Sequence, residues 1–360
     1  LVVPPNTKAF ALDETNASAT PPLAVINASD INADDKLQPN ILMSAIIQSV
    51  DIVIGEGNPA AVGVRMRGAQ GSSIEDVAVF AAPDAFAGIS GCSGSGGAHS
   101  NLTVIGARVG IDARDTQPSA TLSNLRLYNQ SCVALLHEGY ETLTIAGAHV
   151  VVGSSAEPSA AAFVSGAPDQ LPPLAGQCAQ LLAPATNGQP TSDTVAGALS
   201  VIDAGFECQG CRKTTAIATT RNLYLRRVVV DGLAQVSRSY EVKHIDERPW
   251  FELAVRFELA AAASGSNVHE LSVPVPFGWS NYLHEDQFSS TAYINGQPVE
   301  TSGAAVRNTT ALSSSPDWDA MCDRHSWGDN HNSAFPGHHS HNAINVKNAR
   351  YGAVGDGVSD

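Results

Sequence analysis

The sequence predicts an all-β protein, a right-handed parallel β-helix with long loop insertions. A short pattern, an Asp or Asn followed by alternating apolar and polar residues, recurs at intervals of 25, 25, 23 and 18 residues. A second pattern, a small residue between two apolar residues, recurs at nearly the same interval. Two strand-like segments in each interval are typical of a solenoid whose coils stack on one another.

The first pattern opens five segments along the chain. Alternation with a period of two predicts strands with one buried and one exposed face. The Asp or Asn that opens four of the five segments is expected to stack on its counterpart in the next coil and to bond the backbone there. The five segments begin at Asp51, Asp76, Asn101, Asn124 and Thr142.

The second pattern separates the β-helix from two other repetitive folds. Its central residues are Gly63, Gly88, Gly110 and Ala134. A leucine-rich repeat would show Leu at several fixed places and a helical return, and neither is found. The strands of an ordinary β-sandwich would not keep one residue-level register over four cycles. The parallel β-helix is therefore preferred.

The coils are expected to run in order with two interruptions. Residues 1–40 are predicted to be loop and edge material, and clear coils extend from residue 41 to about residue 152. A Pro-rich and Ala-rich insertion at 153–197 is expected to loop out from one corner, where such loops commonly wall a binding cleft. Coils resume within 198–232, with Asn222 as a further copy of the first pattern, before the pattern fades.

Composition indicates a secreted protein with an acidic surface. The chain has 35 Asp and Glu against 20 Lys and Arg, a formal net charge of −15. Such a surface repels nucleic acid and anionic membranes, and no apolar run approaches the roughly 18 residues of a membrane span. Together with N-glycosylation sequons, this predicts an extracellular, cell-wall or cell-surface location. The sequons begin at Asn16, Asn27, Asn101, Asn129 and Asn308.

Cysteine and histidine usage gives no prediction of a metal or cofactor. The chain has 6 cysteines, and the single C-x-x-C motif at Cys208 and Cys211 lacks the second motif of a zinc ribbon. Disulfides are the expected use of these cysteines in a secreted chain. The histidine-rich run from His325 to His341 shows no element that would bring the rings together, so a solvated linker is expected.

The last ten residues carry a resemblance to a known family. The run Tyr-Gly-Ala-Val-Gly-Asp-Gly-Val-Ser-Asp at 351–360 resembles the signature that opens domains of the pectate-lyase superfamily, the rhamnogalacturonase/epimerase-like β-helices. With the preceding repeats, the chain resembles the tandem double-β-helix exo-β-1,3-glucanases. The resemblance implies a first β-helix at 1–245 with incomplete N-terminal coils, an irregular connecting region at 246–340, and the start of a second, truncated domain at 341–360.

Carboxylates, an amide and basic side chains on neighbouring coils are candidates for a polysaccharide site. Carboxylates can transfer protons or activate water, and basic residues can hold the sugar. The expected catalytic residues are Asp112, Asp115, Gln117 and Glu138, and the expected substrate-binding residues are Arg114 and His137. The alternative is that Asp112 and Asp115 only end a strand and that Glu138 lies in a turn.

Three functions are compatible with these observations. The first is a glycoside hydrolase acting on a polysaccharide such as a β-glucan. The second is a lyase or epimerase acting on uronic-acid polymers, and the third is a non-catalytic cell-surface β-helix module. The resemblance implies that Gln117 helps to hold the attacking water and that the general acid belongs to the second β-helix domain, a partner of the first. A chain that is such a fragment is expected to be inactive, or nearly so, alone.

Overall fold

The structure is a computed structural model of the 360-residue chain. Residues 1–325 form a compact unit, and residues 326–360 are outside the part of the chain that the structure describes. The described residues are 1–12, 22–29, 41–93, 97–113, 120–137, 142–153, 161–165, 198–208, 215–219, 222–232, 235–239, 256–258, 268–277, 292–294, 297–299, 308–312 and 314–325.

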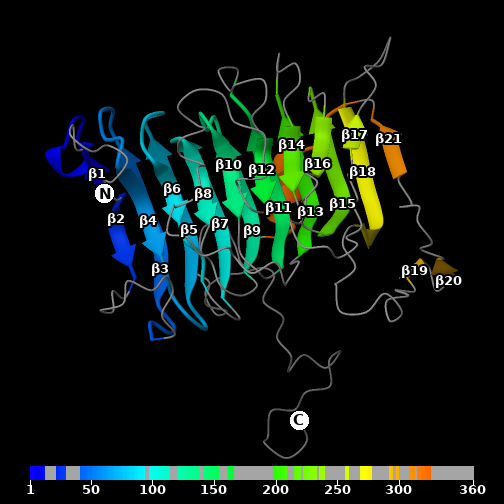
Figure 1. Ribbon diagram of the computed structural model, residues 1–360, viewed down its shortest axis with the longest axis horizontal. Helices are drawn as coiled ribbons and strands as arrows, with labels where there is room; N and C mark the ends of the chain where they lie inside the picture. The colour runs from blue at the N-terminus through cyan, green and yellow to red at the C-terminus, as the bar shows by residue number, and fades with distance from the viewer. Residues whose placement is uncertain are drawn as a thin grey trace, which may run out of the picture. The chain divides into compact units, whose positions relative to one another are not determined.

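Two large sheets, whose strands alternate along most of the chain, form the body of residues 1–325 (Figure 1). Here they are called sheet A and sheet B. Sheet A contains, in spatial order, β1 (Val2–Val3), β3 (Ile46–Ile54), β5 (Ser73–Ala81), β7 (Ala98–Gly106), β9 (Thr121–Tyr128), β11 (Leu143–Val151), β13 (Ala198–Glu207), β15 (Asn222–Asp231), β18 (Val268–Phe277) and β21 (Asn308–Ala311). Sheet B contains β2 (Leu23–Ala28), β4 (Ala61–Met66), β6 (Ala87–Ser90), β8 (Val109–Ala113), β10 (Val133–His137), β12 (Ala161–Ser165), β14 (Thr215–Thr219), β16 (Gln235–Ser239) and β17 (Arg256–Glu258).

Each coil contributes one strand to each sheet, and successive coils pair in parallel. Parallel pairing holds from β1 to β15 in sheet A and from β2 to β16 in sheet B. Helical structure in the described residues is limited to a 3-10 turn, η1 (Lys8–Phe10), and one short helix, α2 (Trp318–Asp323). The prediction of an all-β parallel solenoid is confirmed.

One position of sheet A adopts a left-handed backbone conformation in coil after coil. Asp76, Asn101 and Asn124 occupy this position, with φ of 53°, 54° and 51°, and lie in one register. Their stacking, which the sequence predicted, is confirmed by a bond of 2.8 Å from Asn124 Nδ2 to Asn101 Oδ1. We call this register the ladder. Its members are Ser49, Asp76, Asn101, Asn124, Gly147, Asp203 and Arg227.

The ladder differs from the predicted series at three places. In the first coil Ser49 takes the position expected for Asp51, and in the fifth coil Gly147 takes the position expected for Thr142. Arg227, rather than Asn222, continues the ladder in β15. This position requires a residue with a left-handed backbone conformation, followed by an apolar residue whose side chain points inward. Asn and Asp are the residues that most often adopt this conformation here, but Ser, Gly and Arg also occupy the position.

The small residues of the second pattern form a matching row in sheet B. Val62, Ala87 and Val109 pair in register, so Gly63, Gly88 and Gly110 follow one another between coils. A Cβ atom on Gly63 would come 2.6 Å from the Gly88 carbonyl oxygen and 2.8 Å from a methyl group of Val79 in sheet A. Glycine is therefore required because the two sheets approach closely here.

The space between the sheets is filled by apolar side chains stacked in rows. Leu102, Leu125 and Ala148 form one such row in sheet A, and each is almost completely buried. Phe163 of β12 meets Phe206 of β13 edge-on, with ring centroids 5.0 Å apart, so aromatic packing fills the interior near the later coils. His99 interrupts the apolar row of Ile74 and Leu122 and is 1% exposed.

The later coils end in antiparallel strands. β18 pairs with β15, β21 pairs with β18, and β17 pairs with β16. Parts of the predicted connecting region 246–340 therefore extend both sheets. A separate antiparallel pair is formed by β19 (Ala292–Ile294) and β20 (Gln297–Val299). Within the described part of the chain, no helix is long and apolar enough to cross a membrane.

The described cysteines fall into two kinds. Cys132 and Cys208 are disulfide-bonded, whereas Cys92 and Cys322 are buried thiols. The expected use of cysteines in disulfides is thus found for two of these four residues. Cys178 and Cys211 lie outside the described residues.

Candidate functional site

The structure describes two of the six candidate residues predicted from the sequence. Asp112 is the second-last residue of β8 and His137 is the last residue of β10, and these strands are neighbours in sheet B. Arg114, Asp115, Gln117 and Glu138 lie outside the described residues, so their predicted roles stay predictions.

Asp112 and His137 lie on neighbouring strands but not in the same register. Asp112 pairs with Leu136, so the coil spacing is 24 residues here rather than the expected 23. Strand alternation then places the Asp112 and His137 side chains on opposite faces of the sheet. Both residues are buried, at 6% and 4% exposure. The described residues thus do not bring this pair together on one surface.

The outer face of sheet A carries a different group of polar side chains. One register row runs from Tyr128 through Val151 and Glu207 to Asp231, on β9, β11, β13 and β15. Glu207 and Asp231 pair directly, so their Cα atoms are one strand spacing apart, about 4.8 Å. Two carboxylates therefore lie side by side on one exposed face.

His149 joins Tyr128 to Glu207. The Tyr128 hydroxyl lies 3.0 Å from His149 Nδ1, and His149 Nε2 lies 3.4 Å from Glu207 Oε2. The second distance is that of a long polar contact rather than a short hydrogen bond. A neutral imidazole fits both contacts in one tautomer, with the tyrosine hydroxyl donating to Nδ1 and the Nε2–H group facing the carboxylate.

Burial sets the protonation of the two ring-bearing residues. It lowers the pKa of His149, and the Glu207 carboxylate opposes this shift only partly. Burial also raises the pKa of Tyr128 to about 12. Both effects keep the tyrosine protonated and the imidazole neutral near pH 7. In the series of contacts from Tyr128 through His149 to Glu207, the negative charge therefore lies on Glu207 alone.

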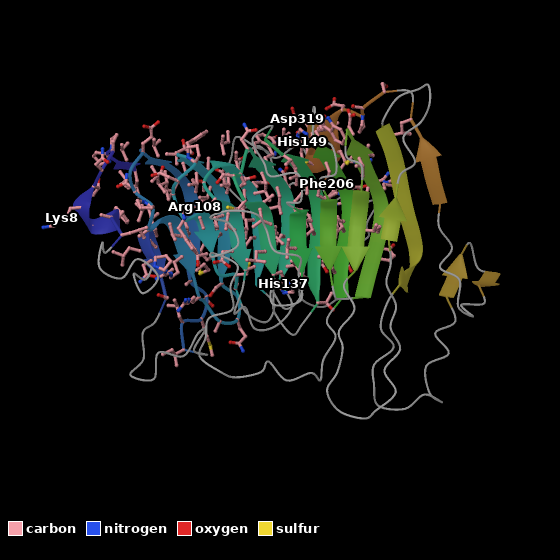
Figure 2. The ribbon with its side chains drawn as sticks, turned by 45° about the horizontal axis from the view of Figure 1, so that its top comes forward. Lys8, Arg108, His137, His149, Phe206 and Asp319 are labelled. Atoms are coloured by element: carbon pink, nitrogen blue, oxygen red, sulfur yellow. The ribbon has the colours of Figure 1, made fainter. Side chains whose placement is uncertain are left out.

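Helix α2 covers one side of this group. The Trp318 ring stacks on the His149 ring at 10° and 5.0 Å, and the Ser315 hydroxyl donates to Asp231 Oδ2 at 2.6 Å. Figure 2 shows His149 and Asp319 close together, with His137 on the opposite side of the fold. The Glu207 side chain remains 27% exposed.

Ion pairs hold α2 and the following His325 against sheet A. Arg126 bonds Asp323 at 2.8 Å and Asp319 at 3.2 Å. His325, at the end of the segment, lies 2.6 Å from Asp203 Oδ2. Hydrogen bonds from Arg227 and His325 lower the pKa of Asp203 against the opposing effect of burial. Asp203 is thus an ionised attachment point rather than a candidate proton donor.

Apolar side chains continue the carboxylate row toward the N-terminal coils. The row before Tyr128 consists of Val53, Phe80 and Ile105. Val53 and Phe80 are 42% and 41% exposed. The outer face of sheet A therefore presents an aromatic and aliphatic strip in register with the carboxylate pair.

A metal centre finds no support in the described residues. No group of three His, Cys, Asp or Glu side chains there could hold an ion. His325, the first member of the histidine-rich run, contacts Asp203 instead of lying in a solvated linker. The other histidines of that run lie outside the described residues.

The carboxylate pair was missed in the sequence because the two residues are equivalent only once the strand register is known. Glu207 and Asp231 each follow an apolar strand and precede Cys208 or Gly232, 24 residues apart. That interval matches the coil length and could have identified them. Trp318 and Ser315 carry no comparable signal, because their approach to sheet A depends on tertiary packing.

Comparisons with protein-family models, with curated proteins and with solved structures gave no match for this chain. The parallel solenoid is established by the strand pairing described above, and the resemblance to the pectate-lyase superfamily stays an expectation.

Proposed function

We propose that the chain is an extracellular, carbohydrate-active β-solenoid, a glycoside hydrolase that binds its polysaccharide on the outer face of sheet A. The observation that carries the proposal is the direct pairing of Glu207 with Asp231 in the row that also holds Tyr128. Glycoside hydrolysis uses two carboxyl groups that flank one bond, and retaining enzymes hold them about 5 Å apart. One strand spacing is compatible with that separation.

The surroundings suggest different roles for the two carboxyl groups. His149 faces Glu207 with its Nε2–H group at 3.4 Å, a contact that would orient this carboxylate. Glu207 would attack the anomeric carbon, while Asp231 would protonate the departing glycosidic oxygen. Water would then cleave the glycosyl–Glu207 ester as the Asp231 carboxylate takes up the water proton. The exposed Phe80 ring, two strands from Tyr128, would support the polymer by stacking on a sugar ring.

Three features support an extracellular location. Cys132 and Cys208 are disulfide-bonded, as is common in oxidising compartments. The chain is acidic, and it contains N-x-Ser/Thr sequons.

The decisive experiment compares two site variants with a matched carboxylate variant. Glu207→Gln and Asp231→Asn should each lower reducing-sugar release from a β-glucan by about 10²–10⁴-fold, because each removes a group that the reaction needs. Glu75→Gln, on β5 of the same sheet, should leave it unchanged. Uronic-acid polymers and the absorbance of unsaturated products test for lyase activity. Sugar release that is unaffected by both site variants would refute the hydrolase proposal. Absence of sugar release by the wild type would refute the assignment of both carboxyl groups to this chain and would agree with the fragment implied by the family resemblance.

A specific observation favours a second candidate, a non-catalytic sugar-binding module. Ser315 already bonds Asp231, and Trp318 already covers His149, so α2 uses part of the polar group for its own attachment. In that case Phe80→Ala would weaken retention on an immobilised glucan. Glu207→Gln would leave retention unchanged, and no variant would release sugar.

A further inference from the structure

Two of the five sequons lie on exposed positions of the described residues. Asn27 is an exposed residue of β2, the last strand in the spatial order of sheet B. The Ser29 hydroxyl of the same sequon donates to Asn27 Oδ1 at 2.7 Å. The amide oxygen and the hydroxyl of this sequon are therefore close together, and the contact lies at the surface.

Asn129 is exposed in the turn after β9. Its φ of 59° belongs to a turn, and its backbone N–H bonds the Val151 carbonyl at 2.9 Å. The backbone is thus fixed by the neighbouring coil while the side chain faces solvent. The Ser131 hydroxyl of this sequon donates to the Pro83 carbonyl at 3.1 Å. A glycan on Asn129 would extend outward without displacing a packed residue.

Asn101 differs from both because it belongs to the ladder. Its Oδ1 accepts the 2.8 Å bond from Asn124, and Asp76 precedes it in the same register. Neighbouring coils are separated by about 4.8 Å, which is less than the width of a sugar with its hydration. A glycan on Asn101 would therefore disrupt the ladder that connects β5, β7 and β9.

We propose that Asn27 and Asn129 are N-glycosylation sites and that Asn101 is not. In the reaction, Asn Nδ2 forms a bond to the anomeric carbon of a lipid-pyrophosphate-linked oligosaccharide and loses one proton, and the lipid pyrophosphate leaves. The co-substrate comes from the secretory pathway of a eukaryotic cell, where the sequon is the acceptor motif. Asn16 and the Asn308 side chain lie outside the description, so the proposal concerns three sequons only.

The test is secretion of the full chain from a eukaryotic host, followed by glycosidase treatment in heavy-oxygen water and peptide mass spectrometry. Label should enter at positions 27 and 129, as each released Asn becomes Asp, and not at position 101. Asn27→Gln and Asn129→Gln should each remove one glycan from the intact mass, whereas Asn101→Gln should remove none. The result does not depend on sugar hydrolysis, so failure of the proposed activity would leave it intact.

Each outcome decides the proposal. A glycan on position 101 in folded, monomeric protein would overturn the exclusion. Wild-type protein without a glycan at position 27 or 129 would overturn the assignment at that position. Thermal unfolding of the two exposed-site Gln variants should match that of glycosidase-treated wild type, which ensures that a lost glycan reflects the lost acceptor rather than misfolding.

Discussion

Each strand of sheet A from β3 to β15 contains a residue with a left-handed backbone conformation. The ladder residues Asp76, Asn101, Asn124 and Asp203 all have φ between 51° and 54°. This conformation is costly for most L-residues, and Asn and Asp reach it more easily because their short side chains bond locally. Gly147 meets the same requirement without a side chain. The backbone conformation is repeated along the solenoid, and the residue type only follows it.

We expect Asn124→Ala to destabilise the protein more than Asn124→Gly. Both substitutions remove the bonds of Asn124 to Asn101 and Arg126, at 2.8 and 2.6 Å. Only alanine also retains the left-handed strain, so it should cost about 1 kcal/mol more than glycine. Urea unfolding of the three proteins measures the difference. Equal losses for alanine and glycine would show that the side-chain bonds alone matter.

His99 should make stability depend on pH. It is buried in the apolar interior, and its ring nitrogens lie 2.9 and 3.0 Å from the amide nitrogens of Ile74 and Ser93. Burial lowers its pKa to about 4 from a usual 6.5. The unfolded chain therefore binds the proton more readily. The His99 contribution is complete above pH 6.5 and is lost as the pH falls toward 4, by about 3 kcal/mol in total.

His99→Gln tests this expectation, since glutamine can still accept a hydrogen bond but does not titrate. The free energy of unfolding of the variant should change less between pH 7 and pH 4 than that of the wild type. His149→Gln serves as a comparison, because burial also lowers the pKa of His149. An unchanged pH slope in His99→Gln would rule out His99 as the titrating group.

At the scale of the element, α2 depends on sheet A for its existence. A six-residue helix is too short to be stable alone, although Asp317 caps it through a 3.0 Å bond from the Ala320 N–H. Met321 and Cys322 are its buried residues. Two glycines of sheet A make room for the segment. A Cβ atom on Gly147 would come 3.0 Å from the Cys322 carbonyl, and one on Gly205 would overlap the Trp318 ring.

Gly205→Ala should displace α2 while leaving the solenoid folded. Alanine suits a strand better than glycine, so any loss reflects the overlap with Trp318. The Cys322 thiol reports the displacement, because it is completely buried and burial raises its pKa to about 12. A thiol reagent should modify Cys322 much faster in the variant than in the wild type. Ser200→Ala, on the same strand β13, is the control. Equal modification rates would mean that α2 tolerates the added methyl group.

At the scale of the whole molecule, the sequence predicts the repeated coils but not the strands and side-chain pairs that occur only once. Glycine in sheet B recurs at Gly63, Gly88 and Gly110, and Asn or Asp recurs in the ladder at Asp76, Asn101 and Asn124, so the solenoid could be inferred. The antiparallel strands β17, β18 and β21 occur once and have no repeat to reveal them. The carboxylate pair was also missed, since Glu207 and Asp231 are equivalent only after the strand register is known. Function was expected near Asp112 because a local cluster of polar residues is visible in sequence.

Net charge should determine which polymers the protein retains. With a formal charge of −15, the chain repels a uronic-acid polymer over the whole molecule, whereas a neutral β-glucan experiences no such repulsion. Salt shortens the screening distance from about 30 Å at 0.01 M to about 3 Å at 1 M. Affinity electrophoresis in gels containing each polymer should show glucan retention that is insensitive to salt. Any uronan retention should be weakest at low salt and should increase as salt is added. Uronan binding that is tightest at low salt would instead reveal a local basic site and would favour the lyase or epimerase alternative over the hydrolase.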